Sequence, residues 1–273
     1  MTTHPRILVP KAPPFLKWPG GKRMLLHRIL PLLPSHFGTY FEPFLGGGAL
    51  FFALQPPQSV LSDVDPGLVN CYVEVRNNPR RVIAHLRRFK NTESDYYRIR
   101  GAPPRSPAAQ AARLIYLTTL SFNGIYRLNL NGEFNVPYGR KTHIDPARPD
   151  SIASASAALA AVQISCGDFQ LIAEQAQPGD LVYCDPPYVV AHSRNGFLKY
   201  NSKLFSWDDQ VRLAAMARQL SRAGCHVLVT NAHHPAVLDL YHGFRIQTAS
   251  RASVIAASAS HRGTTTECII TNF

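Results

Sequence analysis

The sequence predicts an α/β protein built on a doubly wound, mostly parallel sheet. Short apolar runs that end in polar residues alternate with segments of helical periodicity. The clearest run, Leu181–Cys184, is typical of a buried strand and is followed by Asp185-Pro186-Pro187-Tyr188. Prolines end the ladder and stiffen the backbone. Because open α/β sheets bind ligands at the carboxyl ends of their strands, we expect a site here; the alternative is a plain proline turn.

Further elements follow from the same patterns. The last two strands are expected to form an antiparallel edge pair, and the helix after Ser206 begins with a capping box. The expected strands are Thr39–Phe44, Ser59–Asp63, Val162–Cys166, Cys225–Thr230, Phe244–Ser250 and Thr266–Phe273. The expected helices cover 24–33, Ala49–Leu54, a helix capped by Asp65, Ala108–Leu120, 169–176 and a helix from Ser206 to Gly224. The stretch Ser151–Ala161, almost all Ala and Ser, is expected to be a small helix or a linker.

The composition favours a polyanionic partner. The chain has 273 residues, a formal net charge of +12 and a pI near 9.8, and such a surplus of Lys and Arg usually contacts phosphates. The alternative is a merely basic, soluble protein. The five cysteines are scattered without a Cys-x-x-Cys pair, which favours reduced core residues in a reducing compartment. No matching ligand cluster accompanies the histidines, so we expect no metal site.

The chain divides by character into three parts. Residues 1–14 are polar and proline-rich, and we expect a flexible N-terminal arm. Residues 15–75 and 162–273 carry the strands and form the expected main domain. Residues 76–161 are dense in arginine and are expected to be an inserted domain. No run of about 18 apolar residues occurs, so no membrane association is expected.

Two glycine turns suit ligand binding. Leu45-Gly46-Gly47-Gly48 lies between a strand and a helix, where glycines let a backbone approach a ligand closely. Its spacing is neither a dinucleotide fingerprint nor a P-loop, which weakens both readings. Trp18, with Lys17 and Lys22 on either side of Pro19-Gly20-Gly21, suits a flat, charged ligand, although Trp18 could equally be a core aromatic.

Acidic residues at strand ends are the next candidates. Asp63 ends a short strand, where a carboxylate can accept hydrogen bonds from ribose hydroxyls. Asp65 precedes Pro66 and is assigned to helix capping. Asp168 and Phe169 can bind a purine amino group and stack on its ring; Asp168 could equally be only an N-cap.

The inserted region contains a hairpin signal. Ile125–Leu130 and Glu133–Val136 look like two strands around Asn131-Gly132. A β-ribbon rich in Asn, Tyr and Arg can enter a DNA groove and read base edges. The alternative is a solvated basic hairpin, but the net positive charge favours nucleic-acid recognition.

Taken in their order along the chain, the motifs of this sequence resemble those of the Dam-like, alpha-class DNA N6-adenine methyltransferases. The resemblance covers nearly the whole chain. The series is Lys17-Trp-Pro-Gly-Gly-Lys22, Glu42-Pro-Phe-Leu-Gly-Gly-Gly48, Asp63, Asn123-Gly124, Phe134-Asn-Val-Pro-Tyr-Gly139, Gly167-Asp-Phe169, Asp185-Pro-Pro-Tyr188 and Glu267-Cys-Ile-Ile-Thr-Asn272.

The resemblance implies a Rossmann-like methyltransferase fold, with a seven-stranded, mostly parallel sheet whose last strand is antiparallel. It implies S-adenosylmethionine as methyl donor, S-adenosylhomocysteine as product, and no metal. Residues 76–161 would be a small, mainly helical target-recognition subdomain with a β-hairpin. The implied cofactor residues are Trp18, Lys22, Glu42, Phe44, Gly46, Gly48, Asp63, Asp168, Phe169 and Asp185.

The implied activity is site-specific transfer of a methyl group to the N6 atom of a flipped-out adenine in duplex DNA. The amino nitrogen is a poor nucleophile, and hydrogen bonds from it to Asp185 and the Pro186 carbonyl would localise its lone pair. Pro187 keeps these acceptors rigid, and Tyr188 stacks on the base. The implied DNA-binding residues are Lys17, Asn123, Arg127, Asn129, Asn131, Tyr138, Arg140 and Lys141.

Partners and location follow as expectations. We expect a cytoplasmic monomer, in a bacterial or phage-infected cell, with a dimer on DNA and a cognate restriction endonuclease as further possibilities. Asn131 stands where related enzymes often carry a basic residue, which leaves the target sequence open between the family's familiar GATC and another site. The alternative acceptors are N4 of cytosine in DNA and adenine in RNA. The remaining rivals are protein glutamine methylation, a DNA-binding module without activity and a nicotinamide-dependent oxidoreductase.

Overall fold

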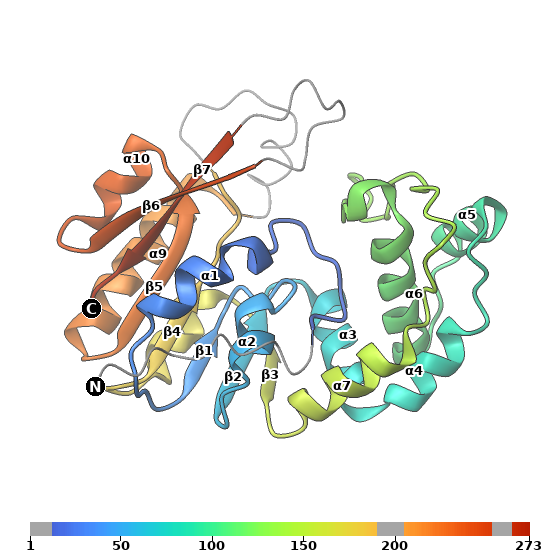
Figure 1. Cartoon of the computed structure of the whole chain (residues 1–273), viewed down its shortest axis with the longest axis horizontal. Coiled ribbons are helices and arrows are strands. Elements are labelled where there is room, and N and C mark those ends of the chain that lie inside the picture. Colours follow the sequence, from blue (N-terminus) through green and yellow to red (C-terminus); the bar gives the residue numbers. More distant parts are fainter. Residues whose placement is uncertain (1–12, 190–204, 253–263) are drawn as a thin grey trace. The chain divides into compact units, whose positions relative to one another are not determined.

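The computed structural model describes residues 13–189, 205–252 and 264–273. The described residues contain a seven-stranded sheet of order β3-β2-β1-β4-β5-β7-β6, whose strands are labelled in Figure 1. The strands are β1 (Tyr40–Glu42), β2 (Ser59–Asp63), β3 (Gln163–Cys166), β4 (Leu181–Cys184), β5 (His226–Ala232), β6 (Arg245–Ala252) and β7 (Thr264–Thr271).

The strand directions confirm the predicted sheet. β1 pairs in parallel with β2 and β4, and β4 pairs in parallel with β5. β7 runs antiparallel to both β5 and β6. The mostly parallel, Rossmann-like sheet with an antiparallel last strand is therefore confirmed, and β2 and β4 have the predicted bounds.

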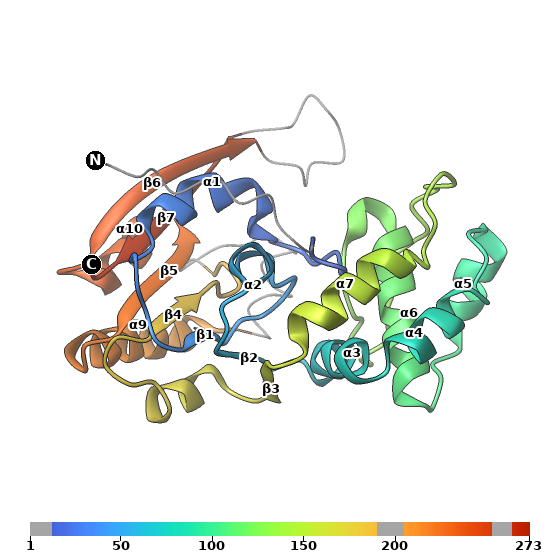
Figure 2. The same cartoon turned by 60° about the horizontal axis from the view of Figure 1, so that its bottom comes forward.

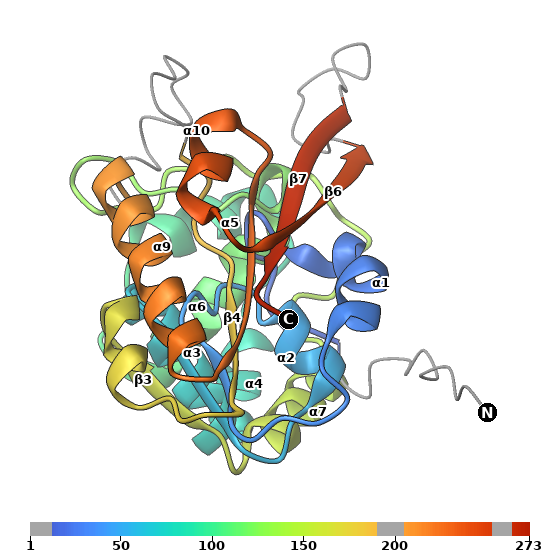
Figure 3. The same ribbon diagram turned by 90° about the vertical axis from the view of Figure 1, so that its left-hand side faces the viewer.

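The chain splits into two compact units, and one of them holds most of the strands. Its described residues fall in 24–45, 58–62, 167–189, 205–252 and 264–273. Apolar side chains of β1, β4, β5 and β7 pack with those of α9 in one core, and Figure 3 shows α9 and α1 on opposite sides of the strands. The helices of this unit are α1 (Leu26–Ile29), η2 (Leu30–Leu32), η4 (Phe169–Glu174), α9 (Trp207–Arg222), α10 (Pro235–Leu238) and η5 (Asp239–Tyr241).

The other unit is mainly helical. Its described residues fall in 13–23, 46–57 and 63–166. Helices α3 and α4 each pack on α6 and α7, and α5 packs on α6, as Figure 2 shows. Its helices are η1 (Lys22–Leu25, which continues into the first unit), α2 (Ala49–Leu54), α3 (Pro66–Asn77), α4 (Pro79–Leu86), α5 (Glu93–Gly101), α6 (Pro107–Leu120), η3 (Phe122–Gly124) and α7 (Pro149–Leu159).

Side-chain caps begin three helices: those at Asp65 and Ser206 were predicted, and the one at Asp168 was considered beside a ligand role. Oδ1 of Asp65 accepts hydrogen bonds from the N–H groups of Gly67 and Leu68, at 2.8 and 3.0 Å. Asp168 caps η4, and Ser206 with Asp209 forms the capping box of α9.

The prediction of a hairpin with two regular strands is wrong. Where Ile125–Leu130 and Glu133–Val136 were expected to pair, the structure has an isolated bridge between Leu128 and Phe134. Oδ1 of Asn129 accepts hydrogen bonds from the N–H groups of Asn131 and Glu133. Side-chain bonds of this kind compete with a ladder, so the segment forms a turn without strands.

Two predicted helices also differ. The segment 24–33 is divided among η1, α1 and η2, because Pro31 stands in the first turn of η2. The segment 169–176 is a 3-10 helix over Phe169–Glu174. The predicted active-site loop 189–203 lies, apart from Val189, outside the described residues, as does residue stretch 1–12 of the predicted arm. Among the described helices none is long and apolar enough to cross a membrane.

Candidate active site

Asp185 follows the last residue of β4. The whole of β4 is buried, whereas Asp185 is only half-buried, so the carboxylate lies where the central strand leaves the core. Oγ1 of Thr230, on β5, donates a hydrogen bond of 2.7 Å to Oδ1 of Asp185. Pro186 is buried and Pro187 half-buried, and both restrict the backbone after the carboxylate. The site therefore presents a held carboxylate on a stiff segment.

Tyr188 ends this segment and is tied to β7. Its hydroxyl donates a 2.8 Å hydrogen bond to Oε2 of the fully buried Glu267. Burial raises the pKa of Tyr188 well above its ordinary value, and the nearby Asp185 and Glu267 carboxylates add to this. Tyr188 is therefore a neutral donor whose ring is held through its hydroxyl.

Glu42 is the last residue of β1, the strand beside β4, and Phe44 follows two residues later. Glu42 is almost fully buried and accepts a 2.8 Å hydrogen bond from the hydroxyl of Tyr40. The ring of Phe44 stacks on that of Phe169, with centroids 5.2 Å apart and planes 28° apart. The buried Phe169 ring thus takes part in core packing.

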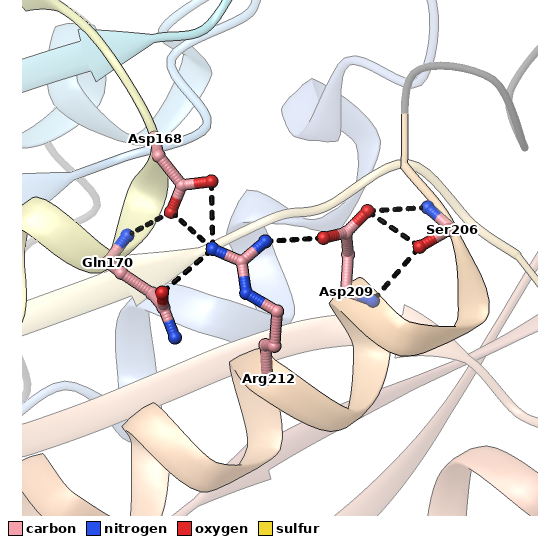
Figure 4. A network of polar contacts seen from close by, with 5 residues as sticks. All are labelled: Asp168, Gln170, Ser206, Asp209 and Arg212. Atoms are coloured by element: carbon pink, nitrogen blue, oxygen red, sulfur yellow. Dashed lines mark hydrogen bonds and ion pairs between the residues drawn. The ribbon is translucent and has the colours of Figure 1, made fainter.

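Asp168 belongs to a network centred on Arg212 of α9 (Figure 4). Nη2 of Arg212 lies 2.9 and 3.0 Å from the two carboxylate oxygens of Asp168 and 2.7 Å from Oε1 of Gln170. Nη1 donates to Oδ1 of Asp209. The hydrogen bond to Asp168 raises the pKa of Arg212. Arg212 also lies over the ring of Phe169, with Cζ 4.9 Å from the centroid.

In the mainly helical unit, Trp18 packs against the glycine turn. A Cβ atom on Gly46 would lie 3.0 Å from Cδ1 of Trp18, and one on Gly48 would lie 2.9 Å from the hydroxyl of Tyr72. Both glycines have positive φ, +46° and +61°, which favours glycine. The Trp18 ring also stacks on Tyr126, with centroids 4.4 Å apart. A side chain at either position would therefore be strained.

Asp63 is held by the backbone of the same unit. Oδ2 accepts a 3.0 Å hydrogen bond from the N–H of Gly46, and Oδ1 accepts one of 3.0 Å from the N–H of Asp65. Burial raises the pKa of Asp63 to about 6. Lys22 is buried, and its Nζ donates a 2.8 Å hydrogen bond to the carbonyl of Gly20.

Five predicted DNA-binding residues are exposed: Lys17, Asn123, Arg127, Asn131 and Arg140. Asn123 and Arg140 adopt positive φ, +54° and +53°. Nε of Arg127 donates a 2.8 Å hydrogen bond to Oδ1 of Asn135.

The other three hold local structure. Asn129 shapes the turn described above. The buried Tyr138 donates a 2.7 Å hydrogen bond to Oδ1 of Asn91. Nζ of Lys141 donates to the carbonyls of Thr119 and Ser121 at the end of α6, and burial lowers its pKa to about 8.

The structure groups the predicted cofactor residues in two sets. Trp18, Lys22, Gly46, Gly48 and Asp63 belong to the mainly helical unit; Glu42, Phe44, Asp168, Phe169 and Asp185 belong to the unit that holds most of the strands. Throughout the described ranges, no group of three or more His, Cys, Asp or Glu residues is arranged to hold a metal ion.

Sequence reasoning missed Thr230 and Arg212, and it noted Glu267 only as part of a motif. Thr230 and Glu267 are polar residues inside apolar strands, and both are fully buried. A buried polar group needs a partner, so their position in the strands is a signal that could have marked them. Arg212 carries no such signal, because it is one polar residue on the outer face of a helix.

Known proteins resemble this chain over most of its length. Residues 18–255 match the family model of the D12 class N6 adenine-specific DNA methyltransferases. A type II methyltransferase of Lactococcus lactis subsp. cremoris, M1.LlaDCHI, is 38% identical over 95% of this chain and 95% of its own. The type II methyltransferase M.MjaIII of Methanocaldococcus jannaschii is 34% identical over 86% and 89% of the two chains.

A third relative is named as a DNA adenine methylase, the activity that the sequence motifs imply. The DNA adenine methylase of Haemophilus influenzae is 32% identical over 86% of this chain and 84% of its own. The match to the family model covers most of the residues, including the whole segment from Trp18 to Tyr188. This chain belongs to the D12 class of N6 adenine-specific DNA methyltransferases.

Proposed function

We propose that this DNA adenine-N6 methyltransferase acts on an adenine flipped out of duplex DNA, and that Asp185, Pro186, Pro187 and Tyr188 form its catalytic segment. The observation that carries the proposal is the position of Asp185, half-buried at the carboxyl end of a central parallel strand. Open α/β sheets bind their ligands at this edge, and chemistry on a base inside a duplex requires that the base leave the stack.

S-adenosylmethionine is the methyl donor that this family and fold imply, and the chain's residues fit it. Asp63 offers a backbone-held carboxylate to ribose hydroxyls, and one of the N–H groups that hold it comes from Gly46 of the glycine turn. Asp168 offers oxygen acceptors to an adenine amino group. The remaining proposed contacts are Trp18, Lys22, Glu42, Phe44 and Phe169.

When bound, S-adenosylmethionine supplies an electrophilic methyl group. Asp185 and the carbonyl of Pro186 accept hydrogen bonds from the two N–H groups of the target adenine. These bonds draw the nitrogen towards tetrahedral geometry, localise its lone pair and stabilise positive charge that develops on it. Tyr188 stacks on the base, and the rigid prolines keep the acceptors in place. The nitrogen loses its proton after transfer, so this chain needs no strong general base.

Residues 76–161 are proposed to recognise the target in double-stranded DNA. The exposed Asn123, Arg127, Asn131 and Arg140 are the proposed readers, and the net charge of +12 supports contact with phosphates. Lys141, Asn129 and Tyr138 would contribute by holding the segment in shape. The similarity to two type II methyltransferases supports a restriction endonuclease as functional partner.

Methylation of plasmid DNA tests the proposal directly. Purified protein is incubated with S-adenosylmethionine and plasmid, and modified bases are mapped by sequencing. We expect N6-methyladenine in one short sequence context; N4-methylcytosine, or methyl transfer to RNA alone, would overturn it. Asp185→Ala should abolish transfer while calorimetry still detects cofactor binding, and full activity of that variant would refute the proposed role of Asp185.

A further inference from the structure

Two hydroxyl groups form a chain of hydrogen bonds that ends at the Asp185 carboxylate. Oγ1 of Thr230 donates a 2.7 Å hydrogen bond to Oδ1 of Asp185. The hydroxyl of Tyr183 lies 3.3 Å from the same Oγ1. A threonine hydroxyl has one hydrogen, which is used here on Asp185, so Tyr183 must be the donor to Thr230. The order of donation therefore runs from Tyr183 to Thr230 to Asp185.

The sheet register produces this arrangement. β4 and β5 pair in parallel, with Tyr183 opposite Leu228 and Cys184 opposite Val229. The next residues in register are Asp185 and Thr230. Because side chains alternate along a strand, Cys184 and Val229 enter the core that α9 covers, whereas Tyr183, Asp185 and Thr230 lie on the other face.

Both hydroxyls are removed from water. Thr230 is 0% exposed and Tyr183 is 1% exposed. Burial raises the pKa of Tyr183 well above its ordinary value, and the Asp185 carboxylate adds to this, so Tyr183 stays a neutral donor. A buried hydroxyl that lost its partner would be costly, and each hydroxyl here has one.

We propose that Thr230, supported by Tyr183, is a positioning residue that sets the rotation of the Asp185 carboxylate. The terminal torsion of an aspartate is broad and roughly two-fold, so an unheld carboxylate turns freely. The bond from Thr230 fixes Oδ1 and directs Oδ2 to the target amino group. This inference rests on the proposed role of Asp185 in accepting the adenine N–H. Small displacements of a reacting group lower rates strongly.

The test compares variants that differ by one hydroxyl. Thr230→Val removes the donor and keeps the size of the side chain, whereas Thr230→Ser keeps the donor. We expect Thr230→Val to lower kcat about 10- to 100-fold, by analogy with the loss of partners that orient metal ligands. Thr230→Ser should restore most of the rate, and Tyr183→Phe should cause a smaller loss than Thr230→Val. The Kd for S-adenosylmethionine, measured by calorimetry, should stay within about twofold, because the change acts on the target amino group.

The unit that holds most of the strands supplies matched controls. Thr271, on β7, is buried, and its hydroxyl donates to the carbonyl of Phe273. Tyr241 is buried, and its hydroxyl has no hydrogen-bond partner among the described residues. Thr271→Val and Tyr241→Phe remove the same hydroxyl groups as Thr230→Val and Tyr183→Phe, but away from Asp185. Both control variants should leave kcat unchanged. Thermal melting of each variant reports any general loss of stability.

The outcomes separate this inference from the proposed function. Equal losses of kcat in Thr230→Val and Thr230→Ser would overturn the inference, because a change in packing alone would explain them. A normal kcat in both Thr230→Val and Tyr183→Phe would also overturn it. If Thr230→Val fails to fold, the inference is tested by comparing the kcat of Tyr183→Phe with that of Tyr241→Phe; equal values would overturn it. Full activity of Asp185→Ala, which removes both side-chain oxygens, would instead refute the proposed role of Asp185. In the Asp185→Asn background, single-turnover rates should not fall further when Thr230→Val is added.

Discussion

The hydroxyl of Tyr188 donates a 2.8 Å hydrogen bond to Glu267, which lies 79 positions further along the chain. Glu267 belongs to β7, where it is paired with Ala232 of β5 and Ala249 of β6. Because strands on both sides hold its backbone, the buried Glu267 carboxylate is a rigid acceptor. The last strand of the sheet therefore fixes the ring of a residue proposed to stack on the target base.

Replacing Glu267 tests this relationship. Glu267→Leu removes the acceptor of this hydrogen bond and so loosens the hold on the Tyr188 ring, whereas Glu267→Gln keeps an oxygen at that place. We expect kcat/KM for duplex DNA to fall about tenfold or more in Glu267→Leu and only slightly in Glu267→Gln, a difference of about 1.4 kcal/mol in the barrier. Steady-state kinetics on a short duplex measures both, and equal activities in the two variants would contradict the prediction.

Cofactor affinity should depend on pH through Asp63. Its pKa is raised to about 6, and ribose hydroxyls donate best to the ionised carboxylate. The Kd for S-adenosylmethionine should therefore be constant well above pH 6 and rise as pH falls below it, by at most about tenfold per pH unit. Calorimetry across this range measures the effect. Asp63→Asn should bind weakly and lose this dependence; the same dependence in Asp63→Asn would assign it to another group.

Arg212 should matter for cofactor binding more than for stability. Its side chain and that of Asp168 are 39% and 47% exposed, and exposed ion pairs contribute about 0–1 kcal/mol. Arg212→Gln should therefore change the Tm little but raise the Kd for S-adenosylmethionine several-fold, since Asp168 loses one of the groups that orient it. Arg222→Gln, on the last turn of the same helix, is the control. An unchanged Kd in Arg212→Gln would argue against this role.

Gly139 should tolerate no side chain. A Cβ atom there would lie 2.6 Å from the carbonyl oxygen of Ser121 and 2.8 Å from that of Leu120. Backbone atoms move only at a cost, so Gly139→Ala should destabilise the protein by roughly 1–3 kcal/mol, or about 2–4 °C in Tm per kcal/mol. At Gly101, at the end of α5, a Cβ atom would meet nothing within 4 Å, and Gly101→Ala should melt like the parent protein. Scanning calorimetry compares the two; similar Tm values would show that the turn adjusts.

Arg127 should contribute to DNA binding. It is exposed and comes from the proposed recognition segment. Arg127→Ala should weaken binding to the methylation target, and a lost phosphate contact would reduce the slope of log K against log salt by about one. Fluorescence anisotropy over a salt series measures both quantities, with the exposed Arg28 of α1 replaced as control. Unchanged affinity, salt slope and target preference would move the recognition surface away from Arg127.

Much of the fold could be predicted because its signals are local. β2 and β4 are short apolar runs bounded by polar residues, and the structure has them at the predicted residues. The Asp65 cap and the Ser206 capping box join groups two or three residues apart. Local patterns failed at residues 125–136, where Asn129 binds the backbone and takes the place of a strand ladder.

The sequence predicted which residues belong to the candidate site, but it did not predict which groups contact them. The motifs marked Asp168, but not that Arg212 binds it from α9. They marked Lys141, but not that two carbonyls at the end of α6 bind its Nζ. Such partners depend on how helices pack, which a motif of a few residues does not encode.

By itself the sequence determined the α/β class, the position of Asp185 after a buried strand and the family. Only the tertiary structure decided which groups stand behind the proposed catalytic segment. Thr230 and Glu267 lie 45 and 79 residues from their partners Asp185 and Tyr188. Their contacts exist because β4, β5 and β7 pair in one register, and a shift of one residue would turn every side chain to the other face of the sheet.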